Sequence, residues 1–153
     1  MQPHSTVSRG ASATSAPQDA GARSHFLRVY YEDTDAGGVV YYANYLKFCE
    51  RARTEWLRAL GVSQQALLSE AGIGFVVRSV QADFLSPARL DDELEVRTHI
   101  ESLRRASIVF KQSILRSGQL LFTAHAQLAC VDMKLNKPTA IPPNLLSSIQ
   151  SQA

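Results

Sequence analysis

The hydrophobic period of the sequence changes at Gly74, and this change limits the fold more than any other feature. Between Val40 and Leu60 the large apolar residues recur at spacings of three and four, which predicts one long helix. After Gly74 apolar and polar residues alternate, and the alternation predicts four strands, at residues 75–85, 93–103, 107–116 and 120–133. Because a helix and a sheet must each bury an apolar surface, we expect an α+β fold in which an antiparallel meander wraps around the long helix.

Shorter segments complete the predicted domain. A first strand is predicted at residues 26–32 and a short second helix at residues 64–70. Residues 1–24 contain few large apolar side chains and predict a disordered extension. Residues 143–153 lie beside a proline pair and predict a mobile tail, so the folded domain is expected at residues 25–142.

Composition excludes several classes of protein. The chain has 153 residues and a net charge of +2, with no basic stripe, so we expect one domain and no nucleic-acid partner. Cys49 and Cys130 lack the spacing of a zinc or redox site, and no metal is expected. No apolar stretch is long enough to insert into a membrane, and the first 24 residues lack a signal-peptide core, which favours a cytoplasmic location. A sheet covered by a single helix leaves its edges open, so we expect a homo-oligomer.

An acidic turn before the long helix is the strongest candidate for chemistry. Asp33 and Asp35 precede Gly37 and Gly38, and the helix follows directly. Glycines let a backbone approach a ligand closely, and the free N–H groups of a helix's first turn favour negative charge. A carboxylate beside such donors suits acyl transfer, in which water is activated while N–H groups stabilise an oxyanion. Asp and Gly are also common turn and cap residues, so the pattern alone leaves a purely structural role open.

Four sequence stretches carry a resemblance to a known family. They are the run RVYYEDTDAGGVVYYANYL at residues 28–46, ERARTE at 50–55, FVVR at 75–78 and PARLDD at 87–92. Together they resemble the 4-hydroxybenzoyl-CoA thioesterase family, and most closely the Tol–Pal system-associated acyl-CoA thioesterases, over about residues 25–142. The resemblance implies a hotdog fold and an active site at the interface of a dimer or of a dimer of dimers. It also implies hydrolysis of an acyl-CoA to free acid and CoA without a cofactor.

The same resemblance assigns roles to individual residues. The family's second motif acid falls on Asp35, which resembles the catalytic nucleophile or general base. The backbone N–H of Tyr42 matches the oxyanion donor, although the Tol–Pal-associated branch commonly carries His at this position. The neighbouring backbone at Gly38, Val40 and Tyr41 is expected to contact the substrate. Arg104 and Arg105 occupy the turn where the family binds the CoA phosphates, and paired arginines suit phosphate recognition.

Two other functions remain open at this point. One is a noncatalytic module that binds acyl-CoA or an acyl carrier protein. The other is an acyl hydratase or dehydratase of the same fold, which typically depends on a histidine in the site. The sequence has no histidine between His25 and His99, which favours hydrolysis.

Overall fold

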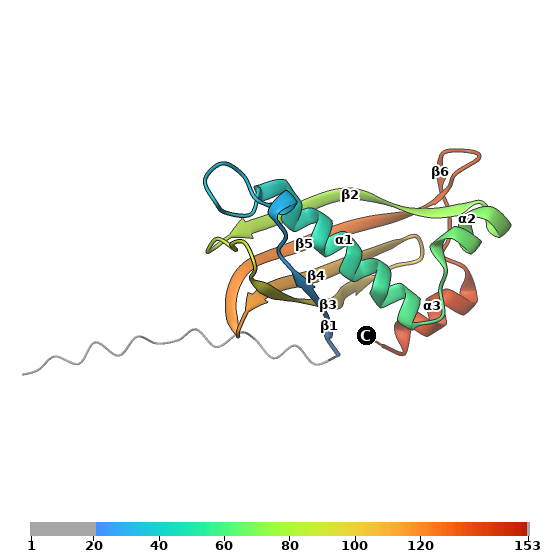
Figure 1. The fold of residues 1–153 in the computed structure, drawn as a ribbon. Coiled ribbons are helices and arrows are strands. Elements are labelled where there is room, and N and C mark those ends of the chain that lie inside the picture. The colour runs from blue at the N-terminus through green and yellow to red at the C-terminus, as the bar shows by residue number, and fades with distance from the viewer. Residues whose placement is uncertain (1–20, 153) are drawn as a thin grey trace, which may run out of the picture.

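The computed structural model of the chain describes residues 21–152 and contains one six-stranded antiparallel sheet (Figure 1). The prediction of a disordered extension lies outside the described residues up to residue 20, but Arg23 and Ser24 belong to the first strand, so the folded part begins earlier than predicted. The strand order is β1-β3-β4-β5-β2, and β6 pairs with β5. The strands are β1 (Arg23–Arg28), β2 (Ile73–Phe84), β3 (Glu93–Leu103), β4 (Ser107–Arg116), β5 (Gln119–Asp132) and β6 (Lys137–Pro138).

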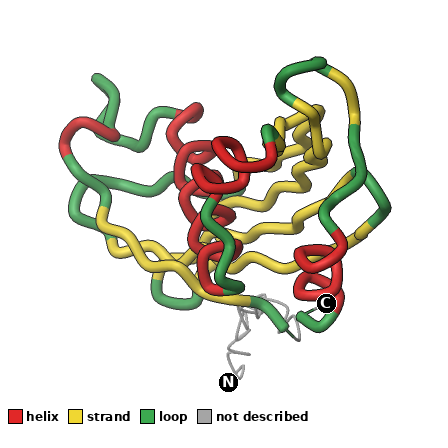
Figure 2. Tube along the Cα trace, turned by 90° about the vertical axis from the view of Figure 1, so that its right-hand side faces the viewer, coloured by secondary structure: helices red, strands yellow, loops and turns green. Residues whose placement is uncertain are grey.

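One long helix, α1 (Tyr42–Ala59), lies against the concave face of the sheet, as Figures 1 and 2 show. The apolar spacing seen in the sequence places one stripe of α1 against the strands, which confirms the predicted α+β class. The short helix α2 (Gln64–Ala71) follows, and a 3₁₀ turn, η1 (Tyr31–Asp33), stands where the first strand was expected to continue. The Asp33 carboxylate accepts the N–H of Tyr30 at 2.8 Å and closes this turn.

The strand order differs from the predicted meander at β2. Strands β3, β4 and β5 are neighbours as expected, but β2 pairs with β5 in a register from Ile73↔Asp132 to Phe84↔Phe122. Alternation identifies strands without revealing their partners. Residues 85–92, which join β2 to β3, do not form a hairpin, because their backbone bonds to the end of β1 and to the start of α1 instead.

The core consists of two apolar clusters along α1. The first surrounds Tyr45 and Phe48 in the N-terminal half of the helix, and the second surrounds Trp56 in the C-terminal half. A third helix, α3 (Pro143–Gln150), contributes buried Leu145 and Ile149 to the second cluster. This segment was expected to be a tail, but its apolar residues four apart give it a face that the core covers.

A buried polar group lies between the two clusters. Gln112 of β4 is 1% exposed, and its side chain accepts a hydrogen bond from Arg53 and donates to Thr98 and to the backbone carbonyl of Cys49, each at 2.9 Å. Arg53 itself is only 8% exposed. Burial lowers the pKa of Arg53, because an apolar surrounding disfavours the charged form.

Candidate active site

The acidic turn, residues 30–39, folds back on itself and presents Asp35 to solvent. The N–H of Asp35 donates to the carbonyl of Val39 at 2.9 Å, and the N–H of Gly38 donates to the carbonyl of Asp35 at 3.0 Å. Gly38 has φ of 76°, a conformation that other residues rarely adopt. The Asp35 Oδ1 atom accepts the N–H of Gly37 at 2.9 Å, and a Cβ on Gly37 would lie only 3.2 Å from that oxygen. Gly38 thus allows the backbone to turn, and Gly37 holds the Asp35 carboxylate in position.

Helix α1 begins beside this turn without a side-chain cap. The N–H of Tyr41 donates to the carbonyl of Asp33 at 3.0 Å, and that of Asn44 donates to Tyr41 at 2.9 Å. Within residues 21–152, the N–H groups of Tyr42 and Ala43 have no acceptor. Two free donors at the positive end of a helix form a ready-made site for an anion or a developing oxyanion.

Asn44 links the acidic turn to the helix, a role that the sequence did not predict. Its side-chain Nδ2 donates to the carbonyl of Asp33 at 2.8 Å, so that carbonyl accepts from Tyr41 and Asn44 together. Asn44 is 8% exposed. A polar residue in a helix's first turn is common, and only the fold reveals that it reaches back to Asp33.

An apolar groove of about 280 Å³ opens next to the free N–H groups. Its lining is Val40, Tyr42, Tyr45, Phe84, Leu85, Ser86 and Pro87. Phe84 lies edge-on to Tyr42 and Tyr45, with ring centroids 6.2 and 5.5 Å away. Such a surface can receive the acyl part of a substrate whose carbonyl meets the Tyr42 N–H. Phe84 was predicted only as a strand residue, because its place beside α1 follows from the unexpected pairing of β2 with β5.

Within one chain, Arg104 and Arg105 are far from Asp35. They lie in the β3–β4 turn, where the carbonyl of Arg105 accepts the N–H of Ile141 at 2.8 Å. Ile141 belongs to the second cluster, at the C-terminal end of α1, whereas the acidic turn lies at the N-terminal end. A helix of 18 residues spans about 27 Å. The structure therefore brings Asp35, Gly38, Val40, Tyr41 and Tyr42 together but leaves the two arginines apart from them.

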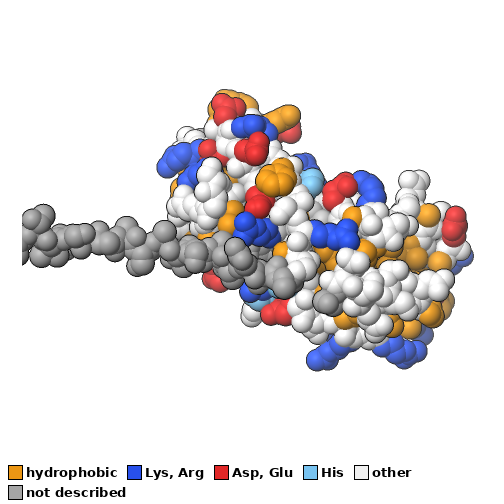
Figure 3. Space-filling view, turned by 90° about the horizontal axis from the view of Figure 1, so that it is seen from below, with side chains coloured by type: hydrophobic (Ala, Val, Ile, Leu, Met, Phe, Trp, Pro, Cys, Tyr) orange, Lys and Arg blue, Asp and Glu red, His pale blue; other side chains and the backbone are white. Residues whose placement is uncertain are grey.

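On the face shown in Figure 3, basic and acidic side chains are intermingled with apolar ones. Among residues 21–152, no cluster of His, Cys, Asp or Glu could hold a metal ion. In the same part of the chain, every helix is too short or too polar to cross a membrane.

Comparison with known proteins identifies the family. The family model described as thioesterase-like superfamily matches residues 29–149. The chain belongs to this family. It is 50% identical over 116 residues to the acyl-CoA thioesterase YbgC of Haemophilus influenzae, covering 76% of this chain and 85% of that protein. It is also 50% identical over 125 residues to the acyl-CoA thioester hydrolase YbgC of Escherichia coli O157:H7, covering 81% and 92%.

Solved structures of the thioesterase family agree with this assignment. A probable thioesterase from Bartonella henselae superposes with a TM-score of 0.76 at 38% identity, covering 79% of this chain and 99% of that one. The predicted resemblance, the hotdog fold and the prediction of a thioester hydrolase are thereby confirmed.

Proposed function

We propose that this chain hydrolyses acyl-CoA thioesters with Asp35 as the catalytic carboxylate and the Tyr42 N–H as the oxyanion donor. Acyl-CoA hydrolysis is the activity of its thioesterase relatives. The observation that carries the residue assignment is the pair of free N–H groups at the start of α1, next to a turn that exposes the Asp35 carboxylate. Tyr42 contributes through its backbone, so Tyr in place of His leaves this donor unchanged.

Hydrolysis requires that an oxygen attacks the thioester carbon and that the CoA sulfur leaves it. Asp35 either attacks this carbon, giving a mixed anhydride that water then hydrolyses, or removes a proton from an attacking water molecule. In both routes the carbonyl oxygen gains negative charge, which the Tyr42 N–H stabilises, and the CoA sulfur leaves and takes up a proton. The backbone of Gly38, Val40 and Tyr41 shapes the approach to this point. The acyl group lies along the groove beside Phe84.

CoA enters the proposed reaction as part of the substrate, and no resident cofactor is proposed. A thioester of an acyl carrier protein presents the same reacting bond and is a second candidate substrate. A cytoplasmic location, where both kinds of thioester are available, stays a prediction.

A second copy of the chain would complete this site. Strand β2 forms an edge of the sheet, with one side of its backbone unpaired in the described chain. Its exposed apolar side chains include Val77 (50%), Val80 (39%) and Phe84 (51%). An open, apolar edge strand readily pairs with its own copy about a twofold axis. Antiparallel pairing would bring the Phe84 end of one chain beside the Ile73 end of the other.

This pairing gives Arg104 and Arg105 a role despite their distance from Asp35 within one chain. The β3–β4 turn lies at the Ile73 end of the sheet. Ser107, which follows this turn, pairs with Ala129 of β5, and Ala129 pairs on its other side with Val76, near the start of β2. The second copy's Arg104 and Arg105 would then face the site that carries Asp35, where they could bind the CoA phosphates. We therefore propose a homodimer, or a dimer of dimers, with sites shared between chains.

Mixing two variants that are impaired at different residues tests the carboxylate and the shared site together. Asp35→Asn should lower the rate of thiol release from acyl-CoA by at least about 10²-fold, because it removes the base or nucleophile. Arg104→Gln/Arg105→Gln should chiefly raise KM. The assay uses a substrate concentration well below this raised KM, where each variant alone is slow. Refolded together at equal amounts, the two variants should recover about a quarter of wild-type activity, since half of the dimers are mixed and each has one intact site.

Glu32→Gln serves as the matched control for the charge change, because Glu32 is an exposed acid of the same turn. It should retain wild-type activity. Full activity of folded Asp35→Asn would refute the carboxylate assignment. If both variants are impaired and mixing recovers nothing, the arginines and Asp35 belong to one chain's site. An unchanged KM in the arginine variant would place the arginines in no site.

A further inference from the structure

The segment that joins β2 to β3, residues 85–92, supports both ends of the acidic turn. Before the turn, the N–H of Val29 donates to the carbonyl of Asp92 at 2.9 Å. After the turn, the N–H of Val40 donates to the carbonyl of Ala88 at 2.8 Å. Val29 and Ala88 are fully buried and Val40 is 4% exposed. Water cannot replace these bonds, so the position of the acidic turn depends on this segment.

The same segment also fixes the start of α1. The N–H of Ala88 donates to the hydroxyl of Tyr45, which is 4% exposed, at 3.0 Å. Tyr45 lies one turn after the N–H of Tyr42. Ala88 therefore contacts the backbone just before the helix and a side chain of its first turn. A shift of Ala88 would move the free N–H groups relative to Asp35.

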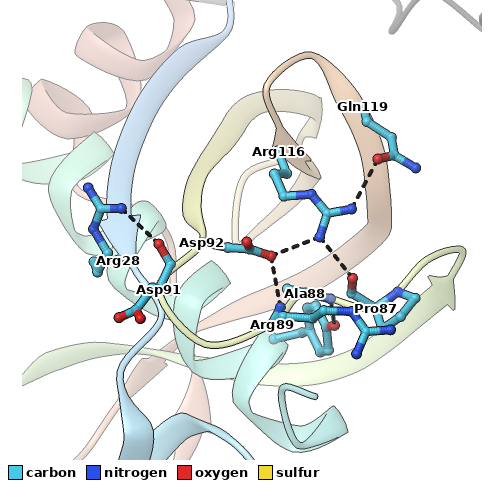
Figure 4. Close-up of polar contacts among 9 residues, drawn as sticks. Arg28, Pro87, Ala88, Arg89, Asp91, Asp92, Arg116 and Gln119 are labelled. Atoms are coloured by element: carbon cyan, nitrogen blue, oxygen red, sulfur yellow. Dashed lines mark hydrogen bonds and ion pairs between the residues drawn. The ribbon is translucent and has the colours of Figure 1, made fainter. Parts of the chain in front are cut away.

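An ion pair between Arg116 of β4 and Asp92 holds this segment, as Figure 4 shows. Arg116 of β4 donates from Nη1 to the Oδ2 atom of Asp92 at 2.8 Å and to the carbonyl of Pro87 at 3.2 Å. The same Asp92 oxygen accepts the N–H of Arg89 at 2.8 Å. The Nη2 atom of Arg116 donates to the side-chain oxygen of Gln119, at the start of β5, at 3.1 Å. One guanidinium thus joins Pro87 and Asp92, which lie on either side of Ala88.

We propose that Asp92 and Arg116 are positioning residues for hydrolysis, which hold the Tyr42 N–H in place relative to Asp35 through Ala88. This inference rests on the proposed function of Asp35 and Tyr42. Neither Asp92 nor Arg116 touches the reacting atoms. Their effect on the rate arises because misplacing a catalytic group by about 1 Å can cost on the order of 10²-fold.

The test compares Asp92→Asn and Arg116→Met with a matched control. The control is Glu95→Gln, which breaks the Arg97–Glu95 ion pair on β3. That pair has similar length, 2.9 Å, and similar exposure, 28% and 18%, against 2.8 Å and 28% and 21% for Arg116 and Asp92. Two readouts are needed: kcat and KM for an acyl-CoA that the wild type hydrolyses, and hydrogen exchange of the Val40 amide.

Asp92→Asn and Arg116→Met should each lower kcat by about tenfold or more while KM changes less than about twofold. Combined, they should lower kcat little further, because either change releases the same segment. Exchange of the Val40 amide should accelerate by about tenfold in both, and Glu95→Gln should change neither readout. If one variant does not fold, Arg116→Lys keeps the charge and loses the fork, and it should show a smaller change of the same kind.

The inference is overturned if the folded variants keep the kcat of the wild type and the wild-type exchange rate of the Val40 amide. An equal fall of kcat in Glu95→Gln would also overturn it, because the effect would then follow from general destabilisation. If the wild type hydrolyses no acyl-CoA, the proposed function fails. The exchange measurement would still decide whether Asp92 and Arg116 hold Val40.

Discussion

Replacing Gln112 with leucine should destabilise the chain more than its modest change in volume suggests. Gln112 supplies the acceptor for the buried Arg53 guanidinium and donates to Thr98 and to the carbonyl of Cys49. Leucine fills a similar space but makes none of these bonds. A charged group that is 8% exposed would then lack its acceptor, and a hydroxyl that is 1% exposed would lose its donor.

The magnitude follows from the three bonds that are lost. A hydrogen bond to a charged group contributes about 1.5–3 kcal/mol and each neutral one about 1 kcal/mol. The apolar surface of leucine offsets part of this, which leaves a loss of about 3–4 kcal/mol in the free energy of unfolding. For a chain of this length that corresponds to a fall in Tm on the order of 10 °C. The double variant Arg53→Met/Gln112→Leu should recover much of the loss, because it removes the stranded charge.

Urea denaturation at one protein concentration measures both variants, and an unchanged m value shows that the midpoints report stability. The reasoning requires the double variant to be more stable than Gln112→Leu alone. A loss of less than about 1 kcal/mol in Gln112→Leu would refute it. So would a double variant whose loss equals the sum of the losses of Gln112→Leu and of Arg53→Met, measured separately in the same way.

Two further predictions concern titrating groups. Partial burial raises the pKa of Asp92, but the hydrogen bonds and charges of Arg116 and Arg89 outweigh it, so this pKa lies below the usual range. The ion pair should therefore stabilise the fold at neutral pH and lose its effect below about pH 4, and the stability difference between wild type and Asp92→Asn, from denaturation at several pH values, should shrink there. Burial raises the pKa of the Cys49 thiol to about 12, despite the opposing charge of Arg53. Iodoacetamide at pH 8 should leave Cys49 unmodified in the native protein and label it in urea, as peptide mass spectrometry would show; rapid native labelling would contradict the burial.

The sequence predicted those features that depend on local pattern. The spacing along α1 and the alternation through β3 and β4 gave elements whose bounds agree with the structure within two residues. Pattern could not reveal that β2 pairs with β5, because alternation carries no information about strand order. Asp35 and Tyr42 were named from a family resemblance, since an Asp-Gly turn alone is equally consistent with a cap.

The contacts that support the site were beyond the reach of the sequence for a different reason. Asn44 reaches Asp33, and Arg116 reaches Asp92 from 24 positions away. Each of these side chains is ordinary for its own element, and only the three-dimensional arrangement joins them. The PARLDD stretch was visible as part of a resemblance, but its role as a support for Val29 and Val40 required the backbone bonds.

The division of the core into two clusters has a consequence for synthesis on the ribosome. Every member of the first cluster lies at or before Ala124, whereas the second is incomplete until Ile149 of α3 has been added. Chains grow from the N-terminus at about 5–20 residues per second. The half of the core beneath the acidic turn can therefore begin to consolidate while the other half still waits for its last residues. We expect nascent chains to expose Trp56 and its neighbours longest, which makes that end of the molecule the natural point of contact for a chaperone.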